Sequence, residues 1–171
     1  MKILGCATAL LALSGAAVAQ QSPANASAKP LVVNITNAEG QAVGTATLSP
    51  AASGVKIVLD VKKLPPGEHS IHIHQTAKCD PPDFKTAGPH FSPAGHTHDS
   101  TPAGDIPDFS LIVGKDGTAH VSTVAPNVTM GDDDRSVFSN GGTAIVIHAV
   151  AGGTGTAAPP RIACGIIAKP Q

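Results

Sequence analysis

The chain has 171 residues and a formal net charge of -1, and charged side chains make up only 13% of it. This length fits one domain with a substantial core, and the small net charge gives no reason to expect nucleic acid or an anionic membrane surface as a partner. Aromatic residues are scarce, at 2%, whereas glycine (18) and proline (15) are abundant. This composition favours short strands joined by many turns, and we expect a small molecule as the partner.

The N-terminus has the pattern of an export signal. Lys2 precedes an apolar run over residues 3–13, and the small-residue cleavage pattern Ala-Val-Ala follows at residues 17–19. Because the run is too short to span a bilayer, we predict a signal peptide over residues 1–19 and a periplasmic or secreted protein without a membrane span. Residues 20–29 are polar and lack an apolar period, which predicts a mobile tail. Residues 30–171 form the predicted domain.

Eight short runs rich in apolar and β-branched residues follow, separated by turn signals such as Glu39-Gly40 and Asn140-Gly141-Gly142. The runs cover residues 31–35, 42–48, 55–61, 70–74, 109–113, 119–124, 143–150 and 162–167. No helical period competes with them. The pattern predicts an all-β, antiparallel sandwich or barrel.

Two long segments do not fit strands. Residues 78–108 are dense in proline, glycine, histidine and aspartate, and residues 151–160 are rich in glycine, alanine and threonine. Loops longer than about 15 residues are usually functional or disordered. Since the first segment contains several possible metal ligands, we interpret it as a long metal-binding loop.

Two histidines stand on one predicted strand. A strand that contains His72 and His74 puts both imidazoles on one face and Ile71 and Ile73 on the other. The two rings are then close enough to bind one metal ion. This pair alone is a weak indication, because surface histidines also arise by chance.

Further histidines occur in the last apolar strand and in the long loop. His148 interrupts an apolar run, where a hydrogen-bonded core histidine is the alternative to a metal ligand. The loop contains a group of possible ligands, namely His90, His96, His98, Asp99 and Asp105. Imidazoles and carboxylates together favour Zn(II) or Cu(II) over metals that prefer thiolates or oxygen ligands alone.

Two cysteines, Cys79 and Cys164, remain after cleavage of the predicted leader. In an exported chain they most simply form one disulfide, which could stabilise the fold by about 4 kcal/mol in the chain-entropy model. Two free buried thiols are the alternative.

Six motifs occur in a fixed order between Pro30 and the C-terminus. They are Gly67-x-His69-x-x-His72-x-His74, Cys79 with Pro82 and Phe84, Ala87-Gly88-Pro89-His90-Phe91-x-Pro93, Gly104-Asp105-Ile106-Pro107, Val146-Ile147-His148 and Arg161-Ile162-Ala163-Cys164-Gly165. In this order they resemble the landmarks of bacterial copper-zinc superoxide dismutases. The resemblance implies an eight-stranded Greek-key barrel or sandwich.

The resemblance also implies an activity and its residues. It implies an enzyme that converts superoxide to dioxygen and hydrogen peroxide at a copper ion bound by His72, His74, His90 and His148. His90 would bridge copper and zinc and supply a proton in catalysis. Arg161 would attract the anionic substrate beside copper, and Cys79 and Cys164 would form the family disulfide.

The zinc half of the site departs from the family pattern. The resemblance matches three zinc ligands, namely His90, His98 and Asp105. The family's remaining histidine is replaced by Pro102, which cannot bind zinc. His96 is a substitute for it, with a solvated loop histidine as the alternative, and Asp99 is a weaker substitute.

A second departure lies between His148 and Arg161, where residues 149–160 contain no carboxylate. The family usually has a longer charged loop there, with an aspartate that links the copper and zinc ligands. Both departures resemble the copper-only branch of the family. A copper-binding or copper-delivery protein on the same scaffold is therefore the alternative function, and a homodimer is left open.

Overall fold

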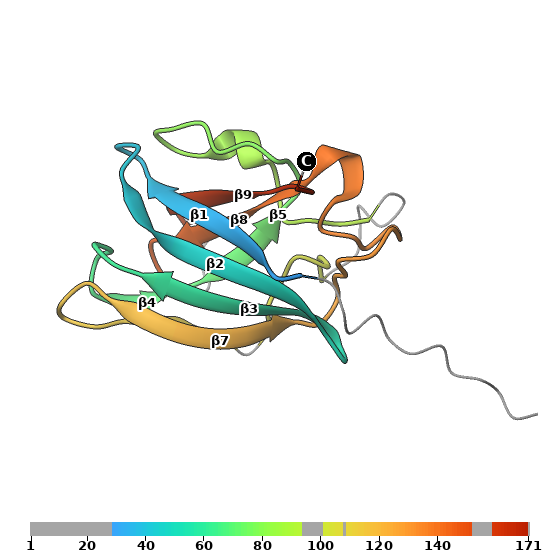
Figure 1. Cartoon of the computed structure of the whole chain (residues 1–171). Helices are drawn as coiled ribbons and strands as arrows, with labels where there is room; N and C mark the ends of the chain where they lie inside the picture. Colours follow the sequence, from blue (N-terminus) through green and yellow to red (C-terminus); the bar gives the residue numbers. More distant parts are fainter. Residues whose placement is uncertain (1–28, 94–100, 108, 152–158, 171) are drawn as a thin grey trace, which may run out of the picture.

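The computed structural model describes residues 29–93, 101–107, 109–151 and 159–170. Over these ranges the chain is almost entirely β-structure, with nine strands and two short 3-10 helices (Figure 1). None of the helices in these ranges is long and apolar enough to cross a membrane. The predicted signal peptide, and all of the predicted tail except Lys29, lie outside the described residues.

Seven strands form one antiparallel sheet that curls round (Figure 1), in the order β5-β8-β9-β1-β2-β3-β7. The strands of this sheet are β1 (Leu31–Asn37), β2 (Ala42–Ala51), β3 (Gly54–Val61), β5 (Ile71–His74), β7 (Ala119–Ala125), β8 (Thr143–His148) and β9 (Arg161–Ile167). A second, two-stranded sheet pairs β4 (Gly67–His69) with β6 (Leu111–Val113), and the 3-10 helices are η1 (Lys85–Ala87) and η2 (Ser139–Gly141). The order places β8 and β9, the last strands of the chain, between β5 and β1.

The structure confirms the all-β antiparallel prediction, and a strand overlaps each of the eight predicted runs. β4 was not predicted, because this strand has only three residues and begins at Gly67, the last residue of the turn-forming sequence Pro65-Pro66-Gly67. Three predicted strands are shorter in the structure. β8 ends at His148, two residues before the predicted end, β6 begins at Leu111 and β5 begins at Ile71.

The main core is built by alternation along the strands. In β3, side chains that point inward are buried and those between them face solvent, as shown by Val55, Ile57 and Leu59 against Lys56 and Asp60. This period of two is the one that the sequence displays. The inward faces therefore form one continuous apolar core.

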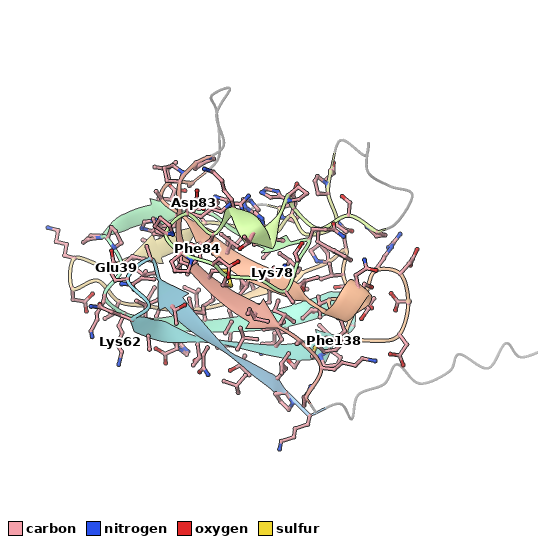
Figure 2. All side chains as sticks on the ribbon, turned by 90° about the horizontal axis from the view of Figure 1, so that it is seen from above. Glu39, Lys62, Lys78, Asp83, Phe84 and Phe138 are labelled. Atoms are coloured by element: carbon pink, nitrogen blue, oxygen red, sulfur yellow. A yellow bond between two sulfur atoms is a disulfide. The ribbon has the colours of Figure 1, made fainter. Side chains whose placement is uncertain are left out.

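β8 is buried on both faces. Ile145 and Ile147 belong to the main core. Ala144 and Val146, on the other face, belong to a second cluster, which also contains Phe84, Ala87 and Cys164. The first part of the long loop thus covers this side of the sheet, and Figure 2 shows Asp83 and Phe84 in the covering segment.

The long loop is fastened to β5 by backbone hydrogen bonds. The amide of Phe91 donates to the carbonyl of Ile73 (2.8 Å), and the amide of Ile73 donates to the carbonyl of Gly104 (2.9 Å). Gly104 is required by this close approach, since a Cβ built on it would lie 2.1 Å from the carbonyl oxygen of Ile73. The middle of the loop, at Phe91, and its later part, at Gly104, are therefore placed relative to the strand that carries His72 and His74.

Candidate metal centre

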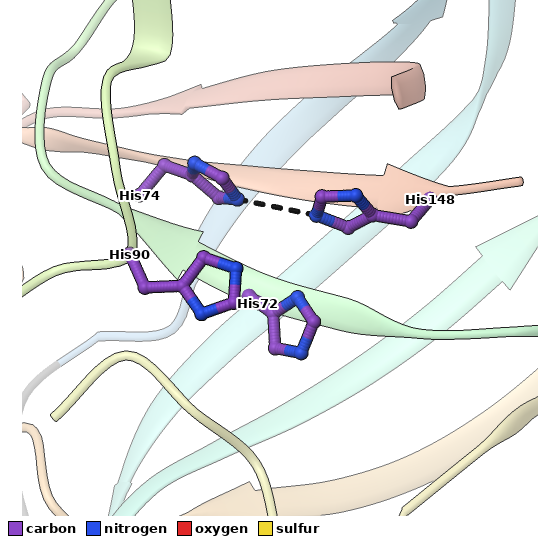
Figure 3. A group of neighbouring side chains, drawn as sticks. All are labelled: His72, His74, His90 and His148. Atoms are coloured by element: carbon purple, nitrogen blue, oxygen red, sulfur yellow. Dashed lines mark hydrogen bonds between the residues drawn. The ribbon is translucent and has the colours of Figure 1, made fainter. Parts of the chain in front are cut away.

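Four histidines from three segments meet at one end of the curled sheet (Figure 3). They are His72 and His74 of β5, His148 at the end of β8 and His90 of the long loop. One ring nitrogen of each lies within 4.8 Å of the corresponding nitrogens of the others. The structure therefore brings together the four residues that the sequence analysis predicted as copper ligands.

The strand register explains why three of these rings share a face. In the pairing of β5 with β8, His72 stands opposite Val146 and His74 opposite Ala144. Opposite residues point to the same side of a sheet, and so do residues two apart on one strand. His148 lies two residues beyond Val146 and therefore faces the same side as both β5 histidines.

Backbone carbonyls fix the proton positions of two rings. Nδ1 of His74 donates to the carbonyl oxygen of Gly88 (2.9 Å), and Nδ1 of His148 donates to that of Pro159 (3.2 Å). A carbonyl oxygen can only accept, so in the neutral imidazoles each Nδ1 holds the hydrogen and each Nε2 presents a lone pair. The two Nε2 atoms lie 3.2 Å apart, the contact drawn as a dashed line in Figure 3.

Two lone pairs that face each other repel unless a cation lies beside them. Two nitrogens that are each about 2 Å from one metal ion lie about 3 Å apart at ordinary coordination angles. The spacing of His74 and His148 therefore fits two ligands of one metal.

His72 also has a feature that is typical of a metal ligand. Its Nδ1 is buried, and among the described residues no hydrogen-bond partner lies within reach. Buried polar atoms are nearly always paired, because an unpaired one costs about 1–3 kcal/mol. A metal ion bound by this nitrogen would remove that cost, so the residues present fit a copper ion.

The surroundings keep the rings neutral. Burial, together with the neighbouring histidines His90 and His148, lowers the pKa of His72 to about 3. Burial likewise lowers the pKa of His74 to about 3 despite its hydrogen bond to Gly88, and burial lowers the pKa of His148. Because metals bind the neutral ring, these imidazoles are ready to bind without first losing a proton.

His90 is oriented by a carboxylate. Its Nδ1 donates to Oδ1 of Asp105 at 2.6 Å, and the two side chains are 32% and 28% exposed. The ring stacks on His72, with centroids 4.0 Å apart and planes at 27°. Nε2 of His90 is thereby left as the ring atom available for a metal.

Arg161, at the start of β9, is held by the loop backbone. Its guanidinium donates to the carbonyls of Phe84 (2.7 Å) and Gly88 (2.8 Å). The Gly88 carbonyl also accepts from His74, so one oxygen links this arginine to the histidine cluster. Its positive charge helps to lower the pKa of His74 and of His148. Within the described ranges no carboxylate forms an ion pair with Arg161, which leaves its charge available to an anion.

Cys79 and Cys164 form a disulfide across 85 residues of sequence. Cys164 lies on β9, three residues after Arg161, and Cys79 lies near the start of the long loop. The alternative of two free thiols is thus excluded, and the bond joins the loop that positions Arg161 to the strand that carries it.

His69 has a role that the sequence analysis did not assign, although it stood in a quoted motif. The side chain is 2% exposed, with Nδ1 2.9 Å from the carbonyl oxygen of His148 and Nε2 2.8 Å from that of Pro65. It therefore connects the end of β8 to the turn before β4. A buried histidine on a strand otherwise occupied by Gly67 and Glu68 gives no sequence pattern from which this role could have been found.

The predicted zinc ligands are only partly described. His90 and Asp105 are in contact, as above, whereas His96, His98 and Asp99 lie outside the described residues. Pro102 accepts a hydrogen bond from the amide of Asp105 through its carbonyl (3.1 Å) and so shapes the turn that presents this carboxylate. The zinc assignments stay predictions.

A curled antiparallel β-sheet with a four-histidine cluster defines a metalloprotein of the β-sandwich or β-barrel class. The family model for copper/zinc superoxide dismutase (SODC) matches residues 42–167. The chain belongs to the copper/zinc superoxide dismutase family.

Individual relatives agree with the family match. The chain is 36% identical to Superoxide dismutase [Cu-Zn] 2 of Aquifex aeolicus (strain VF5), over 97% of this chain and 98% of that protein. It is 33% identical to Superoxide dismutase [Cu-Zn] of Caulobacter vibrioides, over 75% of this chain and 80% of that protein. The crystal structure of a SOD-like protein from Bacillus subtilis superposes with a TM-score of 0.70 at 30% identity, covering 80% of this chain and 97% of that one.

Proposed function

We propose that this protein is a copper-dependent superoxide dismutase. One observation carries the proposal: four histidines with available lone pairs converge beside an arginine that two backbone carbonyls hold in place. The relatives named above carry the same activity in their names. In this proposal His72, His74, His90 and His148 bind the copper ion.

When bound, copper would alternate between Cu(II) and Cu(I), so that one superoxide is oxidised to dioxygen and another, with two protons, is reduced to hydrogen peroxide. The substrate is an anion, and Arg161 is the residue that attracts and orients it. Its two carbonyl partners fix the guanidinium before the substrate arrives. The protein thus supplies a positioned positive charge at no cost of reorganisation.

His90 is the proposed proton donor. Its side chain is 32% exposed, whereas His74 and His148 are buried. It can therefore exchange a proton with solvent more readily than those two ligands. Its hydrogen bond to Asp105 keeps the ring in place while this exchange occurs.

Zinc is the second metal of the family, and His90, Asp105 and His98, with His96 as a substitute, are its proposed ligands. Two ligands of a tetrahedral zinc ion lie about 3.3 Å apart, whereas the described atoms of His90 and Asp105 lie 2.6 Å apart. As arranged here, these two residues form a hydrogen bond, and Asp105 would have to move away from His90 before both could bind one zinc ion.

We also propose export to the periplasm or the cell exterior. The disulfide between Cys79 and Cys164 suits an oxidising compartment. The apolar run at the N-terminus, over residues 3–13, is the segment that would direct export.

Two variants test the proposal when copper content and superoxide consumption are measured on the same purified samples. His148→Ala should lose both, because it removes a ligand. Arg161→Ala should keep its copper and lose about 10-fold or more in rate, because it removes only the attracting charge. Equal copper loss in both variants would contradict the role of Arg161. A copper-loaded protein that consumes no superoxide would favour copper binding or delivery.

A further inference from the structure

The hydrogen bond between His90 and Asp105 orients His90, the fourth of the proposed copper ligands. We propose that Asp105 is a positioning residue for His90 and that it makes copper binding independent of zinc. The inference rests on the proposed function only in taking copper as the metal of the histidine cluster.

The contact determines which ring nitrogen of His90 is free. A carboxylate can only accept, so the hydrogen of the neutral ring lies on Nδ1, 2.6 Å from Oδ1 of Asp105. The lone pair is then on Nε2. Hydrogen bonds of this kind, from a metal-binding imidazole to a carboxylate, fix the tautomer and the ring orientation.

The remaining contacts of the ring leave it little freedom. It stacks on His72 with centroids 4.0 Å apart, and it meets His74 edge to face at 4.9 Å and 72°. His90 and His74 are also bridged through their backbones. The ring is therefore placed among the other ligands by contacts of the chain alone.

Asp105 is itself anchored to the strand of the copper ligands. Gly104, directly before it, accepts a hydrogen bond from the amide of Ile73, and its amide donates to the carbonyl of Phe91 (2.9 Å each). A side chain at Gly104 would collide with the backbone of Ile73. Since Ile73 lies between His72 and His74, the position of Asp105 is tied to both. Contacts within the protein thus connect the strand of His72 and His74 to Asp105 and so to His90, without a second metal ion.

A bridging zinc ion would require a different arrangement. The two atoms that now share a hydrogen would have to move from 2.6 Å to the separation of about 3.3 Å that tetrahedral zinc ligands adopt. The direct bond and a zinc bridge are therefore alternative ways to hold His90. The structure has the first, and copper should bind to it without zinc.

The test measures Cu(II) affinity by competition with a chelator, in zinc-free buffer and again with one equivalent of zinc. Wild type should bind one copper per chain in both, with the same Cu(II) EPR spectrum. Asp105→Ala should bind copper about 10- to 100-fold more weakly, with altered EPR parameters. Asp105→Asn should keep most of the affinity, because its amide oxygen can still accept from Nδ1. Asp134→Ala, which removes an exposed carboxylate elsewhere, should match wild type.

Two results would overturn the inference. One is wild-type affinity in Asp105→Ala without zinc, and the other is weak copper binding by wild type that zinc restores. If Asp105→Ala fails to fold, the affinity of wild type with and without zinc still decides whether copper binding is independent of zinc. Because no superoxide is used, these results are separate from the proposed activity. Asp105-dependent copper binding without dismutation would refute the enzyme and leave this inference standing.

Discussion

Nε2 of His74 lies 3.2 Å from Nε2 of His148, and the hydrogen of each ring is bonded to a backbone carbonyl on its other side. The two atoms therefore oppose lone pair to lone pair. A metal ion bound by both Nε2 atoms would replace the repulsion between their lone pairs with two metal–nitrogen bonds. The folded state should consequently gain stability from copper, and the unfolded chain, which lacks the cluster, should gain much less.

We predict that copper raises the thermal unfolding temperature of the metal-free protein. At free copper 1,000 times the dissociation constant, the gain should be about 4 kcal/mol, measured by calorimetry. His148→Ala should lose the shift, and His120→Ala, at an exposed histidine on β7, should keep it. A shift of equal size in His148→Ala would show that copper acts elsewhere.

The metal-free protein should become less stable as the pH is lowered from about 6.5 towards 3. Burial lowers the pKa of His72 and of His74 from 6.5 to about 3, so in this window the unfolded chain binds more protons than the folded one. The unfolding free energy then falls by up to about 1.4 kcal/mol per pH unit for each such proton. Above pH 6.5 these two groups contribute no pH dependence.

Urea unfolding of the metal-free protein between pH 6.5 and 5.5 measures this effect, in a range where ordinary carboxylates stay almost fully ionised. His72→Gln should show a shallower decline, because its side chain does not titrate. If the unfolding free energy fell equally with pH in wild type and in this variant, His72 would not be a source of the pH dependence.

Much of the fold could be predicted from the sequence, because the alternation of buried and exposed residues is visible within each single strand. The period of two in β3 predicts its buried face, and the same period places His72 and His74 together on β5. β4 was not predicted because its three residues, Gly67 to His69, include none of the apolar or β-branched types that mark a strand.

The site was predicted less completely, for a physical reason. The partners of His74, His148 and Arg161 are backbone carbonyls. Every residue has a carbonyl, so no residue type marks those that accept these bonds. The contact between His90 and Asp105 depends on the path of a 15-residue segment, which residue spacing does not determine. The family resemblance supplied the ligand residues, and only the structure gives their hydrogen-bond partners.

His69→Phe should destabilise the fold although no metal contact is lost. The substitution removes the ring nitrogens that contact the carbonyls of His148 and Pro65. The contact with His148 is buried, and leaving that carbonyl unsatisfied costs about 1–3 kcal/mol. Chemical unfolding of the metal-free variant measures the loss, with His120→Phe as an exposed control. Wild-type stability in His69→Phe would show that these contacts contribute nothing net.

Removal of the disulfide should lower both stability and activity. Cys79→Ser with Cys164→Ser should cost about 2–5 kcal/mol in unfolding free energy. The loop that supplies the carbonyls of Phe84 and Gly88 would lose its link to β9, so Arg161 should be held less firmly. The rate per bound copper should therefore fall further than copper content does. A double variant with an unchanged rate per copper would show that the carbonyls hold Arg161 without the disulfide.

The most direct measurement is a copper titration of the metal-free protein, with the decay rate of superoxide followed after each addition. We expect the catalysed rate to rise in proportion to copper, to reach a plateau at one equivalent per chain and to stay at zero for His148→Ala under the same conditions. A stoichiometrically loaded protein that leaves superoxide decaying at its uncatalysed rate would contradict the account.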